Sequence, residues 1–78
     1  MNIDCQIERQ VGVLSETPRG WTKEINLAVW DGRFAKYDIR TWDPNHQPKG
    51  GVTLTLNELQ KLYELVGAEL ERRKGETA

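Results

Sequence analysis

Cysteine, long apolar runs and a strong net charge are all nearly absent from this sequence. Cys5 is the only cysteine among 78 residues, so no disulfide framework is expected, and a lone thiol is typical of a reducing compartment. No apolar run is long enough to cross a membrane. Residues 1–6 lack the basic start and apolar core of a secretory signal. We therefore expect a cytoplasmic protein with no membrane partner.

Residue groups that carry catalysis or bind metals are also missing. His46 is the only histidine, and no second ligand lies at metal-binding spacing from it. Cys5 has no histidine near it in sequence that could activate it as a nucleophile. Lys49-Gly50-Gly51 lacks the spacing of a phosphate-binding P-loop. The sequence predicts no enzyme, no metal site, no cofactor and no small-molecule substrate.

The chain is short enough to form one domain with a thin core. We place this domain at residues 7–74, between a flexible start at 1–6 and a flexible tail at 75–78. The net charge of −1 weighs against a nucleic-acid partner, because nucleic-acid-binding domains are often strongly basic. Net charge averages over faces, however, so the position of each charge matters more.

Four segments have the pattern of β-strands. Residues 7–14 are followed by a loop rich in polar residues, proline and glycine. Residues 21–30 alternate between apolar odd positions and polar even positions, as a half-buried strand does. Residues 34–42 follow the hairpin signal Asp31-Gly32, and residues 52–54 form a short fourth strand. The four segments together predict an antiparallel sheet.

The register of the central hairpin is also predictable. A three-residue loop, with Gly32 relieving a bulge, keeps odd positions of one strand opposite odd positions of the other. Every cross-strand pair then agrees in chemistry. The predicted pairs are Leu27 with Tyr37, Ile25 with Ile39, and Glu24 with Arg40.

A helix is predicted to begin after Thr55, the N-cap residue, which forms a capping box with Glu58. Apolar residues then recur at about 100° per residue. This stripe is wide enough to cover the odd face of the sheet and leave apolar surface for a second copy of the helix. We therefore expect an α+β fold, a four-stranded antiparallel sheet followed by one C-terminal helix, in a helix-mediated homodimer. The residues expected at the dimer interface are Leu59, Leu62, Tyr63, Val66 and Leu70.

With the helix on the odd face, the even face of the sheet is open. It carries Trp30 and Trp42, and Lys36 and Arg40 alternate with these aromatics. Bases of single strands stack on aromatic rings at roughly 1–3 kcal/mol per base, and cationic side chains contact phosphates. Residues 19–51 contain six Lys and Arg against four acids, a local charge of 6 − 4 = +2. The predicted nucleic-acid-binding residues are Trp30, Arg33, Phe34, Lys36, Arg40, Trp42, Lys49 and Lys23.

Three segments of the chain carry distinct motifs. Residues 30–33 have a tryptophan before a Gly turn, and residues 37–44 have Asp-Ile-Arg before a tryptophan and Asp-Pro. Residues 49–55 have a Lys-Gly turn that leads into a short strand and the helix. The combination resembles the transcriptional coactivator positive cofactor four family, and it is similar to the short bacterial members of that family. The similarity extends from about Val11 to Leu70.

This resemblance implies four antiparallel strands followed by a helix, and a homodimer joined largely through the helices. It also implies that single-stranded DNA binds with little sequence preference, in channels lined by aromatic and basic residues. The family's binding positions match Trp30, Arg33, Arg40, Trp42 and Lys49.

The chain also departs from the family's eukaryotic pattern. Spacing shifts by one residue on each side of Asp-Ile-Arg, so Lys36 and Trp42 match it less closely. Asp31 stands where a basic residue is usual. The serine- and lysine-rich regulatory extension is absent. The resemblance therefore implies the binding core and not a regulatory coactivator.

The resulting hypothesis is a sequence-tolerant single-stranded DNA-binding protein, with RNA as a further ligand and a role in transcription regulation or DNA maintenance. The alternative is a homodimeric protein-interaction module that uses the aromatic face of the sheet. A third hypothesis is a purely structural dimer with no ligand. In this case Trp30 and Trp42 pack across the ends of a thin sheet, as aromatics at hairpin ends commonly do.

Overall fold

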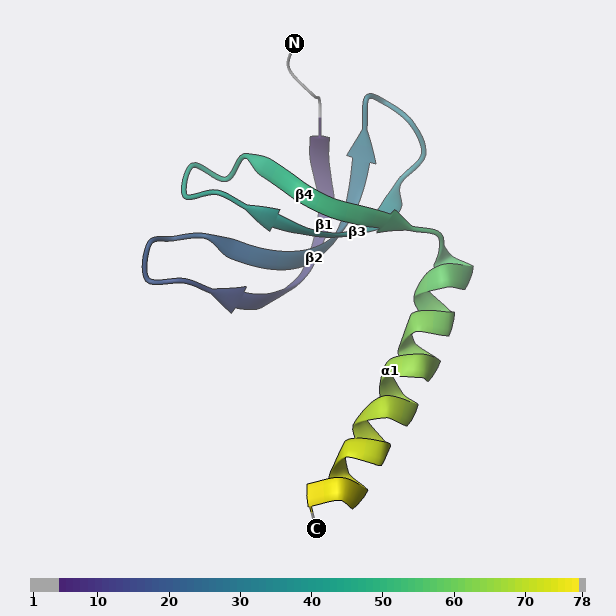
Figure 1. The fold of residues 1–78 in the computed structure, drawn as a ribbon. Helices are drawn as coiled ribbons and strands as arrows, with labels where there is room; N and C mark the ends of the chain where they lie inside the picture. Colours follow the sequence, from purple (N-terminus) through teal and green to yellow (C-terminus); the bar gives the residue numbers. More distant parts are fainter. Residues whose placement is uncertain (1–4, 78) are drawn as a thin grey trace.

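A computed structural model describes residues 5–77 of the chain, and the side chains of residues 5–76. One antiparallel sheet has the strand order β1-β2-β3-β4, and a single helix follows it (Figure 1). The predicted α+β fold, a four-stranded antiparallel sheet with one C-terminal helix, is confirmed. The elements are β1 (Cys5–Glu16), β2 (Thr22–Trp30), β3 (Lys36–Trp42), β4 (Pro48–Leu54) and α1 (Leu56–Thr77).

The predicted register between β2 and β3 is confirmed, because Leu27 lies opposite Tyr37 and Ile25 opposite Ile39. The predicted three-residue loop is wrong. The β2–β3 pairing stops at Ala28, and β3 begins only at Lys36. The last residues of β2 pair with β1 instead, so Phe34 lies in the β2–β3 loop and not on the third strand.

Both outer strands are longer than the sequence indicated. β1 begins at Cys5, opposite Trp30, so part of the expected flexible start belongs to the sheet, whereas residues 1–4 lie outside the described residues. β1 has three register shifts against β2. Such bulges bend a strand and increase its twist. β4 begins at Pro48, four residues earlier than predicted.

The helix begins with the predicted capping box. The Thr55 backbone N–H donates to Glu58 Oε1 at 2.8 Å, and the Glu58 backbone N–H donates to Thr55 Oγ1 at 3.2 Å. α1 continues through Thr77, beyond the expected end at residue 74. No helix within residues 5–77 combines the length and the apolar character that a membrane crossing requires.

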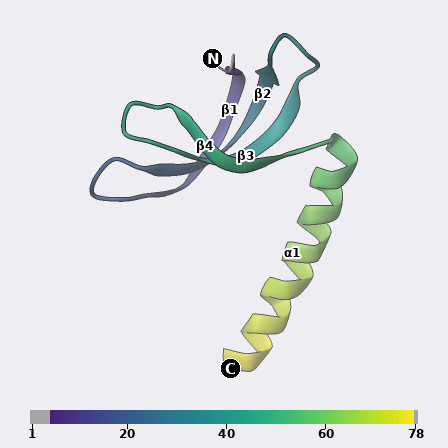
Figure 2. The same cartoon turned by 45° about the horizontal axis from the view of Figure 1, so that its top comes forward.

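The helix does not cover the sheet, and here the sequence-based expectation was wrong. α1 leaves the end of β4 and points away from the strands in both views (Figures 1 and 2). Its contacts with the sheet are sparse and involve mainly β3 and β4. Ile25, Leu27 and Val29, on the odd face of β2, are therefore only half-buried. The apolar stripe predicted the helix, but not the surface against which it packs.

Burial in the sheet is also the reverse of what we expected. The even positions are buried, including Glu24, Asn26, Ala28 and Asp38. The prediction of an open even face is therefore wrong for most of its length. Alternation of polar and apolar residues locates the two faces, but it does not show which of them the chain's own loops and long side chains cover.

Gly51 allows β4 to lie close against β3, opposite Arg40. A Cβ atom added at Gly51 would overlap Arg40 Cβ and Ile39 O, and it would lie 2.6 Å from Arg40 Cα. Because these are mainly backbone atoms of the neighbouring strand, they cannot move aside without disturbing the sheet. A Cβ atom added at Gly50, one position earlier, would have no heavy atom of the surrounding chain within 4 Å.

We expect Gly51→Ala to lower the free energy of unfolding by about 1–3 kcal/mol, the usual range for overpacking at a closely packed position. Urea denaturation followed by circular dichroism measures this change. Gly50→Ala is the matched control, and it should stay within about 0.5 kcal/mol of the wild type. Equal stability of the two variants would contradict the close approach of β4 to β3.

Candidate nucleic-acid interface

The candidate site is the even face of β2 and β3, which we call the polar face. It is built on direct cross-strand pairs, since Glu24 lies opposite Arg40 and Asn26 lies opposite Asp38. Buried carboxylates are unusual in a small sheet, because burying a charge costs free energy unless the charge is paired. The residues of the polar face are Glu24, Asn26, Ala28, Trp30, Lys36, Asp38, Arg40 and Trp42.

An ion pair between Arg40 and Asp38 lies at the centre of the polar face. Arg40 Nε donates to Asp38 Oδ1 at 2.9 Å, and Arg40 Nη2 donates to Asp38 Oδ2 at 2.8 Å. A third donor, Nη1, reaches the backbone carbonyl of Lys49 at 2.6 Å. The guanidinium also lies 4.5 Å from the centre of the Trp30 ring. Arg40 therefore uses its donors within the chain, and its side chain is only 14% exposed.

Glu24 is the second buried carboxylate, and it accepts hydrogen bonds from three side chains. Thr22 Oγ1 donates to Oε2 at 2.6 Å, Asn26 Nδ2 donates to Oε1 at 3.1 Å, and His46 Nε2 lies 3.3 Å from Oε2. Burial alone would raise the pKa of the Glu24 carboxyl. The three hydrogen bonds and the charge of His46 outweigh burial and hold this pKa below its ordinary value of 4.5.

Trp42 lies at the end of the polar face, beneath the loop of residues 43–47. The His46 ring stacks on the indole of Trp42, with ring centres 4.3 Å apart and planes 10° from parallel. Trp42 is only 3% exposed as a result. The sequence predicted Trp42 as an open stacking surface, whereas the structure buries it.

The loop that carries His46 is held in place by Asp43. Asp43 Oδ1 accepts the backbone N–H groups of Asn45 and Gln47, both at 2.9 Å. The backbone N–H of His46 donates to the Asp43 carbonyl at 2.8 Å. His46 itself has a φ of 57°, a left-handed conformation that is uncommon outside glycine, although histidine adopts it more often than most residues do. The His46 ring is therefore positioned by a defined turn.

The opposite end of the polar face is exposed and basic. Phe34 is 92% exposed, and Arg33 and Lys36 flank it in the β2–β3 loop and at the start of β3. These residues line a hollow of about 180 Å³ together with Trp30 and Thr53. We call Trp30, Arg33, Phe34 and Lys36 the Phe34 cluster, since it brings together four of the eight predicted nucleic-acid-binding residues.

The two remaining predicted lysines lie apart from the Phe34 cluster. Lys49 is half-exposed on β4 and lies 3.7 Å from Asp43 Oδ2. Lys23 occupies an odd position of β2, opposite Thr41, so it belongs to the other face of the sheet. The structure therefore does not bring Lys23 together with the other predicted residues.

Three buried polar atoms of the polar face have no hydrogen-bond partner among the described residues. They are Asn26 Oδ1 and the Nε1 atoms of Trp30 and Trp42. An unpaired buried polar atom costs about 1–3 kcal/mol.

Two residues that line the candidate site were missed from sequence. Thr53 lies opposite Asp38, and no register had been predicted for the fourth strand. His46 was considered only as a metal ligand. Its position four residues after Trp42, next to the turn-forming Asp43-Pro44, was the signal available. No group of three or more metal-binding side chains occurs among residues 5–76.

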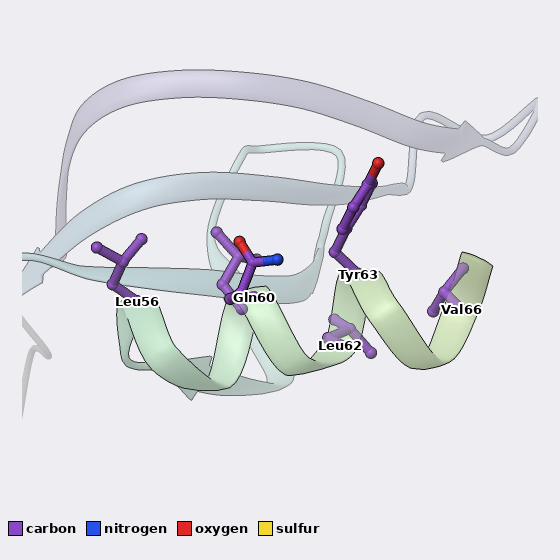
Figure 3. A pocket seen from close by; sticks show the side chains of 6 residues that line it. Leu56, Gln60, Leu62, Tyr63 and Val66 are labelled. Carbon is purple, nitrogen blue, oxygen red and sulfur yellow. The ribbon is translucent and has the colours of Figure 1, made fainter. Parts of the chain in front are cut away.

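A second surface of interest lies on α1, away from the sheet. Apolar side chains line a groove of about 520 Å³ along the first three turns of the helix (Figure 3). Four of the five residues predicted for the dimer interface lie there, and Leu70 follows one turn beyond. Leu70, Tyr63 and Val66 are exposed in the single chain. The residues that line the groove are Leu56, Leu59, Gln60, Leu62, Tyr63 and Val66.

The lowered pKa of Glu24 predicts a specific pH dependence of stability. A carboxyl whose pKa is lowered by folding stabilises the fold above its unfolded pKa, and this contribution is lost as pH falls through the folded-state pKa. Wild-type stability should therefore fall below about pH 5 more steeply than that of Glu24→Gln. Urea denaturation at a series of pH values measures the two slopes. Glu16→Gln, at the exposed end of β1, is the control and should keep the wild-type slope, whereas an unchanged slope in Glu24→Gln would refute the prediction.

Comparison with known proteins relates the chain to a bacterial sequence by identity alone, because no named function accompanies the match. No protein-family model matches the sequence. A protein of Treponema pallidum (strain Nichols), described as an uncharacterized protein, is 41% identical over 64 residues. The matched stretch covers 81% of this chain and 75% of the relative. At this identity and coverage, the chain belongs to the same family as the Treponema pallidum protein.

Proposed function

We propose that this chain is a sequence-tolerant single-stranded DNA-binding protein, with RNA as a further ligand, and that it acts as a homodimer. The observation that carries the proposal is the Phe34 cluster, in which an almost fully exposed aromatic ring lies between two cations. The resemblance to the positive cofactor four family supports the same function. Transcription regulation or DNA maintenance is the corresponding role.

Exposure of the Phe34 ring is hard to explain by packing. At 92% exposure, this ring contributes almost nothing to the core, although a buried phenylalanine contributes about 1.5–3 kcal/mol. A base that stacks on an exposed aromatic ring gains a similar amount without any sequence-specific hydrogen bond. The hollow beside Phe34 offers a second aromatic ring in Trp30.

The distribution of charge on the polar face favours phosphate binding at the same end of the sheet, beside Phe34. Arg40 is neutralised by Asp38, and Lys49 is paired with Asp43. Arg33 and Lys36 are both exposed beside Phe34. Phosphates of a strand whose base stacks on Phe34 would therefore meet positive charge locally, despite the net charge of −1.

The exposed stripe of α1 supports the homodimer. A helix of 22 residues whose apolar stripe is largely exposed gains little stability in water, because most helical stability in proteins comes from packing of an apolar face. A second copy of α1 offers the same stripe, so an isologous contact covers both. We assign Leu59, Leu62, Tyr63, Val66 and Leu70 to this contact.

Binding is tested by titrating the protein with oligothymidine and following intrinsic tryptophan fluorescence at low salt. We expect Phe34→Ala to weaken binding about 5- to 100-fold, the equivalent of one lost base stack. Because Phe34 is exposed, this change should leave thermal stability intact. Trp21→Ala is the control, since Trp21 directly precedes β2, at the other end of this strand from Trp30, and is partly exposed.

The salt dependence of binding separates DNA binding from protein interaction. Contacts with phosphates release counterions, so affinity should fall steeply as salt rises, and Lys36→Gln should make the slope shallower. No response to oligothymidine at low salt would refute the proposed function. Salt-independent capture of a protein partner by the Phe34 cluster would support the interaction module instead.

The dimer is tested by placing a charge in the apolar stripe. We expect Val66→Glu to convert a dimer into a monomer at micromolar concentration, because the dimer would have to bury an unpaired carboxylate. Multi-angle light scattering measures the mass. Ala68→Glu, two residues on and therefore about 200° around the helix, is the matched control and should remain dimeric. A folded wild-type monomer at micromolar concentration would refute the dimer.

A further inference from the structure

At the Trp42 end of the polar face, we infer that the exposed ring of His46, and not the indole of Trp42, is the surface on which a nucleic-acid base stacks. This inference rests on the proposed single-stranded DNA binding and assigns a second contact point, separate from the Phe34 cluster. Histidine is one of the side chains on which bases of single strands stack.

Trp42 cannot accept a base in the observed arrangement. One face of its ring lies against the His46 ring, and the whole residue is 3% exposed. A base could reach the indole only if His46 left, which would break the ring stack and the contact with Glu24. Stacking on His46 requires neither loss.

The His46 ring has the properties of a prepared stacking surface. Its side chain is 51% exposed, although one face is stacked on Trp42 and Nε2 lies 3.3 Å from Glu24 Oε2. These two contacts fix the tilt and the rotation of the ring, and the turn closed by Asp43 fixes its backbone. A ring that is already held in place loses little conformational entropy when a ligand binds to it.

Two substitutions separate the ring from its contact with Glu24. His46→Phe keeps an aromatic ring over Trp42 and removes the Nε2 atom that contacts Glu24. His46→Asn removes the ring, and asparagine tolerates the left-handed backbone found at this position. Gln47→Ala, one residue further along the same loop, is the matched control, because its backbone N–H still donates to Asp43. Circular dichroism of each variant establishes that it is folded.

The experiment measures the affinity of the full chain for fluorescent oligothymidine and for an abasic strand with the same number of phosphates. We expect His46→Phe to keep the wild-type preference for oligothymidine over the abasic strand. His46→Asn should lose about fivefold or more for oligothymidine, with little change for the abasic strand.

Other results would overturn the inference. Tighter binding by His46→Asn would show that His46 is a cover over Trp42, which the strand must displace. Wild-type affinity of His46→Asn for oligothymidine would remove His46 from the site, while loss of binding in Phe34→Ala would still support the proposed function. Absence of any wild-type binding would refute the proposed function and this inference together.

Discussion

The ion pair between Asp38 and Arg40 is the contact on which the rest of the sheet depends. A carboxylate with no solvent exposure is tolerated only when it is fully paired, and Arg40 provides two of its donors for this purpose. The same guanidinium fixes β4 through the Lys49 carbonyl and covers one face of Trp30. The close approach of Gly51 brings β4 within reach of Arg40. The Arg40 side chain thereby links β3, β4 and the aromatic end of β2, so its charge is used in contacts within the chain and not in contacts with a ligand.

Features of the fold that depend on contacts between nearby or directly paired residues could be predicted from the sequence, and features that depend on distant contacts could not. Capping of α1 at Thr55, the strand pattern and the β2–β3 register all follow from residues near each other in the chain or directly opposite each other in a hairpin. The position of α1 does not, because an amphipathic stripe specifies that a partner is needed but not where it lies. The site was predicted in part. Phe34, Arg33 and Lys36 are exposed together as their composition suggested, whereas burial of Trp42 depends on a loop whose conformation comes from Asp43 and a left-handed His46.

The two exposed surfaces of the chain are chemically different and physically separate. The Phe34 cluster combines an aromatic ring with cations at the end of the sheet, whereas α1 presents an almost purely apolar stripe along its first turns. A nucleic-acid strand bound at the Phe34 cluster and a second copy of α1 packed on the apolar stripe would therefore occupy different sites. A homodimer formed through α1 would leave the polar face of each copy available, because α1 does not cover either face of its own sheet.

The three bulges of β1 have a consequence for how copies of the chain can associate. β1 is an outer strand of the sheet, and a regular outer strand with apolar side chains such as Val11 and Val13 exposed would act as a template for strands from other molecules. Each register shift interrupts the row of free N–H and C=O groups and twists it away from a neighbour. The sheet edge formed by β1 therefore resists open-ended, fibril-like growth, although apolar side chains of this strand and of α1 are exposed.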